Sequence, residues 1–190
     1  MKKLIVAVLF SGLVTLAHGQ AVEVEGVKFE PAVQVGGQTL QLNGAGVRTR
    51  LMFKVYAAGL YVPQKAKSAG ELLAQKGPRR VEIGMLRTVD AKTFADSLND
   101  GLKANTPEAQ LAGFKSQIET LHENLKAIGE AKKGDLIQFE FTPEAGTRII
   151  VNGTPRGAAI PGEDFFEAVL RIWIGDKPAD ADLKKAMLRG

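Results

Sequence analysis

Alternating apolar and polar residues predict several strands. Residues 22–29 (VEVEGVKF) alternate throughout and predict one strand. Residues 47–62 are rich in β-branched and aromatic side chains and predict two strands, or one bent strand, around a glycine kink at Ala57-Ala58-Gly59. Shorter strands are expected at 31–35, 39–42 and 81–88, with turns at 36–37 and 43–46, and residues 135–142 and 147–152 flank a Pro-Glu-Ala-Gly turn, as in a hairpin.

Apolar residues spaced by three or four positions predict the helices. Phe94, Leu98 and Leu102 follow a capping residue, Asp90. A second helix starts at Thr106-Pro107 and carries one apolar stripe as far as residue 128. Residues 163–174 are apolar almost all round and predict a buried helix, and short helices are expected at 68–75 and 179–188. This order of elements predicts an α+β fold, with helices packed on one face of a mainly antiparallel sheet.

The start of the chain has the pattern of a secretory signal. Lys2 and Lys3 precede an uncharged apolar run at residues 4–16, and small residues follow at 17–21. The run is shorter than the roughly 20 residues of a membrane span. We therefore expect a signal peptide at residues 1–20, a single domain at 21–190 with no membrane span, and a periplasmic or secreted product, the short lysine-led signal being of bacterial type.

The amino-acid composition limits the kinds of site that the protein can form. Removing the two signal lysines lowers the formal net charge from +4 to +2, too little for the basic face of a nucleic-acid-binding protein, and Arg79-Arg80 is expected to be a solvated pair. The chain has no cysteine, and one histidine, His122, remains after the signal on the charged side of a helical pattern. We expect no disulfide, no metal site and no nucleotide cofactor.

Several motifs, taken in order, resemble the chalcone isomerase family. Residues 24–31 resemble its opening strand, 44–48 its glycine-rich turn ending in the functional arginine, 53–62 the next strand, 93–98 the start of its first pocket helix, and 133–135 and 174–177 later landmarks. In the plant enzymes that arginine faces the negative charge that develops as a chalcone closes to a flavanone. The resemblance assigns this role to Arg48, since a guanidinium is permanently charged and can hold two oxygens.

The other polar groups of the enzymes do not carry over. Tyr56 stands where the enzymes have a threonine, Phe94 replaces a tyrosine, Gly101 an asparagine, and Ile172 a serine or threonine. Non-catalytic relatives bind fatty acids through an arginine and a tyrosine. The resemblance thus implies a site of Arg48 and Tyr56 for an anionic, amphiphilic small molecule, whose tail would lie along Phe94, Leu98 and Ile172.

Alternatives remain at this point. Arg48 shares a strand face with Arg50, so either the chain bends near Gly46 to separate them, which we favour, or several cations surround an anion. Tyr56 could equally fill the core. The leading hypothesis is an exported, non-catalytic binding protein for a fatty acid or similar acid. An intramolecular lyase or isomerase that uses Arg48, and a structural protein with a filled cavity, are the alternatives.

Overall fold

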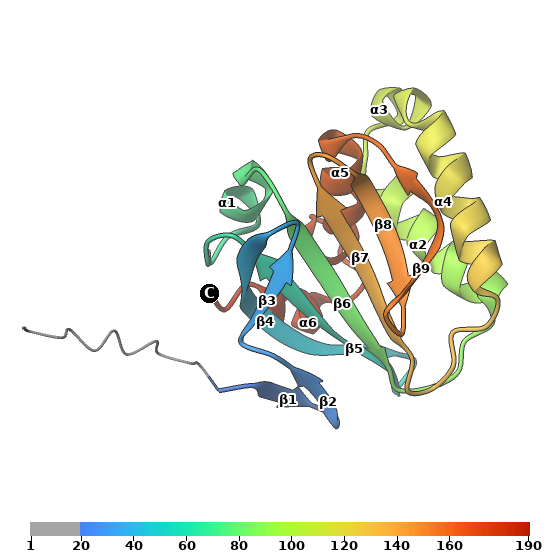
Figure 1. Ribbon diagram of the computed structural model, residues 1–190. Helices are drawn as coiled ribbons and strands as arrows, with labels where there is room; N and C mark the ends of the chain where they lie inside the picture. Colours follow the sequence, from blue (N-terminus) through green and yellow to red (C-terminus); the bar gives the residue numbers. More distant parts are fainter. Residues whose placement is uncertain (1–19) are drawn as a thin grey trace, which may run out of the picture.

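A seven-stranded antiparallel sheet organises the protein (Figure 1). The computed structural model describes residues 20–190, so all of the expected signal except Gln20 lies outside the described residues. Each strand pairs with the next one in the sequence. The strands are β3 (Ala32–Val35), β4 (Gln38–Arg50), β5 (Phe53–Val62), β6 (Arg79–Met85), β7 (Leu136–Thr142), β8 (Gly146–Val151) and β9 (Thr154–Ile160).

Helices cover one face of this curled sheet, which confirms the predicted α+β class. They are α1 (Ala69–Ala74), α2 (Ala91–Asn105), α3 (Glu108–Gly113), α4 (Lys115–Ile128), α5 (Glu163–Ile174) and α6 (Ala181–Met187). The main core lies between these helices and the sheet, and α5 contributes the largest buried set of side chains. Because α5 is apolar on nearly all sides, it can pack against the sheet and against α2 at once.

The opposite face of the sheet carries a second, smaller core under the start of the chain. Residues 22–29 form a hairpin of β1 (Val22–Val24) and β2 (Val27–Phe29), not the single predicted strand, because Glu25 and Gly26 take positive φ values of 53° and 79°. The Phe29 ring packs directly over Gly59, where a Cβ atom would come within 2.7 Å of it. Gly59 therefore marks a close contact, and β5 runs through it without the predicted kink.

Two glycines in β4 were also wrongly predicted to form a turn. Residues 43–46 continue one long strand because α6 lies against it. A Cβ atom on Gly46 would approach that of Ala186 to 2.6 Å, and one on Gly44 would collide with the Ala186 carbonyl oxygen. The turn lies instead at Leu51-Met52. It was not predicted because large apolar residues are not typical of turns.

Three further predictions needed correction. The helix expected up to residue 128 is broken at Phe114 into α3 and α4. The edge strand β9 escaped prediction, because six of its seven residues are exposed and show no alternation. Arg79, expected to be solvated, is completely buried.

Other predictions agree with the structure. They are the hairpin of β7 and β8, the Asp90 cap of α2, the buried α5 and the exposed position of His122.

Candidate functional site

Arg48 and Tyr56 are direct cross-strand partners on the helix-covered face of the sheet. Strands β4 and β5 pair them in register, so their side chains leave the sheet side by side. The Arg48 guanidinium carbon lies 5.5 Å from the centre of the Tyr56 ring, within the range of a cation–π contact. The two residues proposed from the sequence to form a site are therefore brought together.

The Tyr56 hydroxyl is buried and held in place by α5. Trp173 Nε1 donates a hydrogen bond of 2.9 Å to the phenolic oxygen. Burial raises the pKa of Tyr56, and the Arg48 charge and the Trp173 hydrogen bond only partly oppose it. The phenol is thus neutral at ordinary pH. Its own hydrogen finds no acceptor among residues 20–190, so it can donate to a bound molecule.

Among residues 20–190, the Arg48 guanidinium has no hydrogen-bonding or ion-pair partner. Its Nε is buried and makes no hydrogen bond to any described residue. Within residues 20–190 no carboxylate lies within ion-pair distance of it. A buried donor on a charged group is costly to leave unsatisfied, so this position favours an anion from outside the chain.

A small void lies beneath these side chains. Its volume is about 10 Å³, which is the least that can hold one water molecule. Its lining residues are Arg48, Tyr56, Phe94, Ser97, Leu98, Ile172 and Ala179. It has room for a polar atom beside Arg48 and Tyr56, but a hydrocarbon tail along Phe94, Leu98 and Ile172 would require these side chains to move.

The larger space lies on the outer side of Arg48 and Phe94. This outer cavity has a volume of about 310 Å³, near the lower end for a ligand pocket. Its lining residues are Arg48, Arg50, Leu51, Phe53, Val55, Arg87, Thr88, Val89, Asp90, Thr93, Phe94 and Ser97. The favoured bend at Gly46 is absent: β4 pairs with β5 without interruption from Gly44 to Arg48, and the register shifts only just before Gly44 and just after Arg48. Arg48 and Arg50 both reach this cavity. Arg87 joins them, so three cations and one acid, Asp90, surround the space.

Gly101 lies apart from both spaces. A Cβ atom at this position would come within 2.8 Å of the Ile172 side chain. The missing side chain lets α2 and α5 approach closely. Gly101 thus contributes helix packing behind the site, and Ile172 joins this packing to the inner void.

The sequence reasoning missed three side chains of the site. Ser97 lies between the two spaces, Arg87 adds a third cation and Trp173 fixes the Tyr56 hydroxyl. Ser97 could have been found from its spacing, since it follows Phe94 by three residues on α2 and so shares its face. Arg87 and Trp173 come from other elements, and only the fold brings them here.

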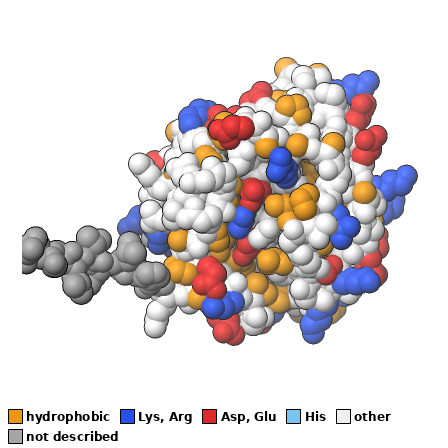
Figure 2. Space-filling view, in the orientation of Figure 1, with side chains coloured by type: hydrophobic (Ala, Val, Ile, Leu, Met, Phe, Trp, Pro, Cys, Tyr) orange, Lys and Arg blue, Asp and Glu red, His pale blue; other side chains and the backbone are white. Residues whose placement is uncertain are grey.

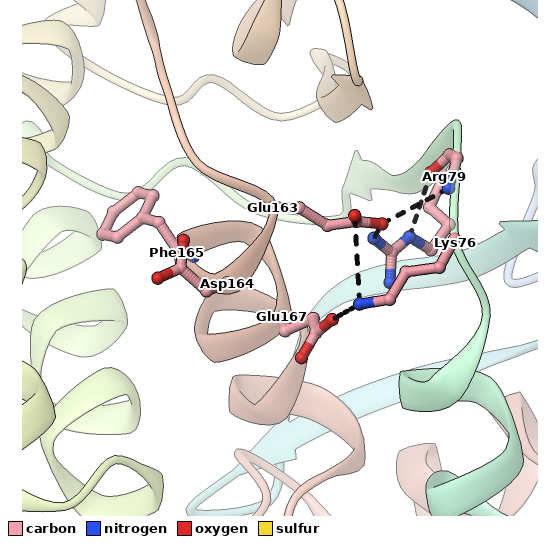
Figure 3. Close-up of polar contacts among 7 residues, drawn as sticks. Lys76, Arg79, Glu163, Asp164, Phe165 and Glu167 are labelled. Atoms are coloured by element: carbon pink, nitrogen blue, oxygen red, sulfur yellow. Dashed lines mark hydrogen bonds and ion pairs between the residues drawn. The ribbon is translucent and has the colours of Figure 1, made fainter.

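In a second cluster of charges, around Arg79, other residues of the chain pair the arginine, although its Nη1 has no hydrogen-bond partner among the described residues (Figure 3). Arg79 Nη2 donates to Glu163 at 2.5 Å, its Nε donates to the Gly77 carbonyl at 3.2 Å, and Lys76 bridges Glu163 and Glu167. The Arg79 guanidinium carbon also lies 5.5 Å from the ring centres of Phe141 and Phe166. Burial lowers the pKa of Arg79, while the Glu163 carboxylate acts against that change. These contacts make it a structural ion pair.

Other kinds of site find little support in the described part of the chain. Within residues 20–190, His, Asp and Glu side chains do not gather in the groups of three or more that would hold a metal ion. None of the helices in this range is both long and apolar enough to cross a lipid bilayer. On the face shown in Figure 2, basic and acidic side chains are interspersed.

A helix-covered antiparallel sheet with an unpaired arginine at a cavity defines an α+β protein with a small-molecule-sized pocket. The chain belongs to the chalcone isomerase-like family, whose model matches residues 21–189. The fold is similar to that of a fatty-acid binding protein from Arabidopsis thaliana, with a TM-score of 0.65 and 16% sequence identity over 90% of this chain and 96% of that one. No curated protein matches the sequence.

Proposed function

We propose that this protein is an exported, non-catalytic binding protein that holds a fatty acid or a similar anionic amphiphile through Arg48. The observation that carries the proposal is the buried, unpaired Nε of Arg48 beside a neutral Tyr56 hydroxyl at the edge of a cavity. The fatty-acid binding protein of similar fold supports the choice of ligand. Export is supported by the signal pattern at residues 1–20.

The carboxylate would sit at the boundary between the two spaces. One guanidinium edge can donate two parallel hydrogen bonds to the two oxygens of a carboxylate, and Nε is one of those donors. The Tyr56 hydroxyl can add a third hydrogen bond, with its ring held by Trp173. This head group would satisfy the donors that the chain leaves open.

The tail would run outward from Arg48 into the outer cavity. Leu51, Phe53, Val55 and Phe94 supply apolar surface along this path. This differs from the path along Leu98 and Ile172 that the resemblance implied, where the void is only about 10 Å³. Because the outer cavity is small for a ligand pocket, an acid of modest length fits it best.

The same residues argue against plant-type cyclisation. Phe94 and Ile172 offer only hydrocarbon where the enzymes have hydroxyl groups that orient the substrate. Arg48 alone could still stabilise developing negative charge, so an intramolecular lyase or isomerase is the alternative. A chalcone assay tests it directly: turnover above the uncatalysed rate that is lost in Arg48→Ala would replace the binding proposal by an enzymatic one.

The decisive test compares ligand binding in two arginine variants. Native mass spectrometry of protein purified from its source compartment should show a bound acid at near-equal stoichiometry. Arg48→Ala should lose it and bind added fatty acid at least about tenfold more weakly, since a charge-assisted pair is removed. Arg50→Ala, which removes an exposed cation from the same cavity, should weaken binding only about two- to threefold. Equal affinities in Arg48→Ala and the unaltered protein would overturn the proposal.

A further inference from the structure

The turn between β4 and β5 exposes three consecutive large apolar side chains. Leu51 is 82% exposed, Met52 93% and Phe53 58%. Among residues 20–190, Val22, at 42%, is the only other exposed large apolar side chain. We call Leu51, Met52 and Phe53 the hairpin tip. Its apolar surface is unusual because it is continuous and stands at the end of a projecting hairpin.

The backbone of this turn makes its residue types more unexpected. Leu51 and Met52 have φ values of 47° and 68°, the left-handed conformation that a type I′ hairpin turn requires at both of its central positions. Asn-Gly or Asp-Gly is the favourable pair there, because an L side chain is strained at positive φ. The chain carries Leu-Met instead, although both side chains are exposed and add little to the core.

Basic side chains surround the hairpin tip. Arg50 precedes it and Lys54 follows it, while Arg87 places its guanidinium carbon 4.8 Å from the centre of the Phe53 ring. Arg50 and Arg87 make no ion pair with any residue in the range 20–190, and Lys54 pairs with Glu25 at 2.7 Å. An apolar tip within a ring of cations has the chemistry of a segment that enters the interface of an anionic lipid bilayer.

We propose that the hairpin tip docks this protein on an anionic lipid surface. Leu51 and Met52 enter the boundary between head groups and acyl chains, and Arg50, Lys54 and Arg87 face the lipid phosphates. Charge complementarity selects a membrane over an apolar protein surface, since the cations at the rim would be desolvated against the latter without partners.

Docking would also place the outer cavity at the membrane surface. Arg50, Leu51, Phe53 and Arg87 belong both to the tip region and to the lining of the cavity. A membrane-resident acid keeps its carboxylate at the surface and its tail in the bilayer. It could therefore reach Arg48 head first, with its tail following past the hairpin tip. This last step rests on the proposed function, whereas docking itself does not.

The test uses the chain from Ala21, because the apolar run at residues 4–16 would itself bind lipid. All helices, all strands and both cores of the described structure lie within this part. Co-sedimentation is measured with phosphatidylcholine vesicles and with vesicles of phosphatidylcholine and phosphatidylglycerol, free of fatty acid. Binding is expected to the anionic vesicles and to weaken as salt is added.

The informative variant is Leu51→Asn/Met52→Gly, which supplies the pair that this turn favours and so should fold at least as well. Its partition onto anionic vesicles should fall at least about tenfold. Val22→Thr, at the other exposed apolar residue, should bind normally. Arg50→Glu should also weaken binding, whereas Arg156→Glu, an exposed arginine on β9, should change it little.

Each of three outcomes would overturn the proposal. The unaltered chain could ignore both kinds of vesicle, or the double variant could bind as well as the unaltered chain. Alternatively, the chain could self-associate through the tip, seen as concentration-dependent sedimentation without lipid that the double variant abolishes. Acid binding is measured separately in vesicle-free solution with Arg48→Ala, so failure of docking and failure of the proposed function give different results.

Discussion

Two arginines on the helix-covered face of the sheet differ in what surrounds their charge. Arg79 is completely buried, yet Glu163, the Gly77 carbonyl and two aromatic rings engage its guanidinium. Arg48 is half-buried, lies over one aromatic ring and has no internal anion among the described residues. Burial alone therefore does not mark a functional arginine. A functional arginine is better indicated by a guanidinium that is partly buried but has no carboxylate partner within the fold.

The largest effect should come from breaking the Arg79 pair. Arg79→Ala removes a buried cation, leaves a hole beside Phe141 and Phe166 and deprives Glu163 of its main partner. The free energy of unfolding should fall by about 3–5 kcal/mol, measured by urea denaturation. Arg79→Met combined with Glu163→Gln restores apolar packing without a lone charge and should recover most of the loss. A loss below about 1 kcal/mol in Arg79→Ala would mean that the pair is not structural.

A smaller effect is expected at the support of the Arg48 site. Trp173→Phe removes the donor to the Tyr56 hydroxyl and should lower the free energy of unfolding by about 1–2 kcal/mol. Fatty-acid affinity should also fall, because the ring beneath Arg48 is less firmly held. A double-mutant cycle with Tyr56→Phe isolates the hydrogen bond, and a coupling energy near zero would show that Trp173 acts only by packing.

Arg48→Ala should hardly change stability, in contrast to Arg79→Ala. The side chain leaves no internal carboxylate behind, so the free energy of unfolding should stay within about 0.5 kcal/mol of that of the unaltered protein. The same urea experiment applies to both arginines. A loss as large as that in Arg79→Ala would place Arg48 among the structural residues and remove the contrast.

The smallest effect concerns the one acid at the outer cavity. Hydrogen bonds from Thr93 lower the pKa of Asp90 below its ordinary value of 3.8. The ionised Asp90 cap therefore stabilises the fold at pH values above 3.8. This stabilisation is lost as the pH falls through the lower pKa that Asp90 has in the folded state. Asp90→Asn keeps a capping oxygen without the titration. Its unfolding midpoint should depend less on pH between about pH 5 and pH 2 than that of the unaltered protein. Parallel pH profiles would contradict this assignment.

Periodic patterns predicted most of the helices and of the sheet, because α2 and the hairpin of β7 and β8 bury one regular face, and α5 was recognised by its apolar residues on nearly all sides. Glycine was harder to interpret. Gly44, Gly46 and Gly59 were assigned to a turn and a kink, but they make room for Ala186 and Phe29, which arrive from distant parts of the chain. A sequence shows that a side chain is missing at a position without showing what fills the space.

The site was less predictable than the fold. Arg48 and Tyr56 were proposed as site residues from the resemblance to the family. Their cross-strand pairing places the two side chains next to each other. Trp173 and Arg87 lie far from them in the sequence, and the pattern of apolar residues says nothing of a hydrogen bond to Tyr56 or of a third cation at the cavity. Arg79 was wrongly predicted to be solvated, because the adjacent Arg80 suggested an exposed basic pair. Its partner, Glu163, lies on α5, and the sequence pattern does not show that the fold brings the two together.

The position of α6 has a consequence for how the pocket comes into being. Neighbouring strands of the sheet are consecutive in the sequence, but only some pairs are hairpins, because α1 separates β5 from β6 and three helices separate β6 from β7. Helices α5 and α6 add contacts of much longer range, since Trp173 reaches Tyr56 across 117 residues and Asn43 donates to the Met187 carbonyl across 144 residues. Ala179 lines the inner void, and Asp180 accepts a hydrogen bond from the Thr49 amide beside Arg48. The inner void, with Ile172 and Ala179 in its lining, is therefore complete only after α5 and the segment that leads to α6 have packed against the sheet, whereas residues 48–97 alone line the outer cavity.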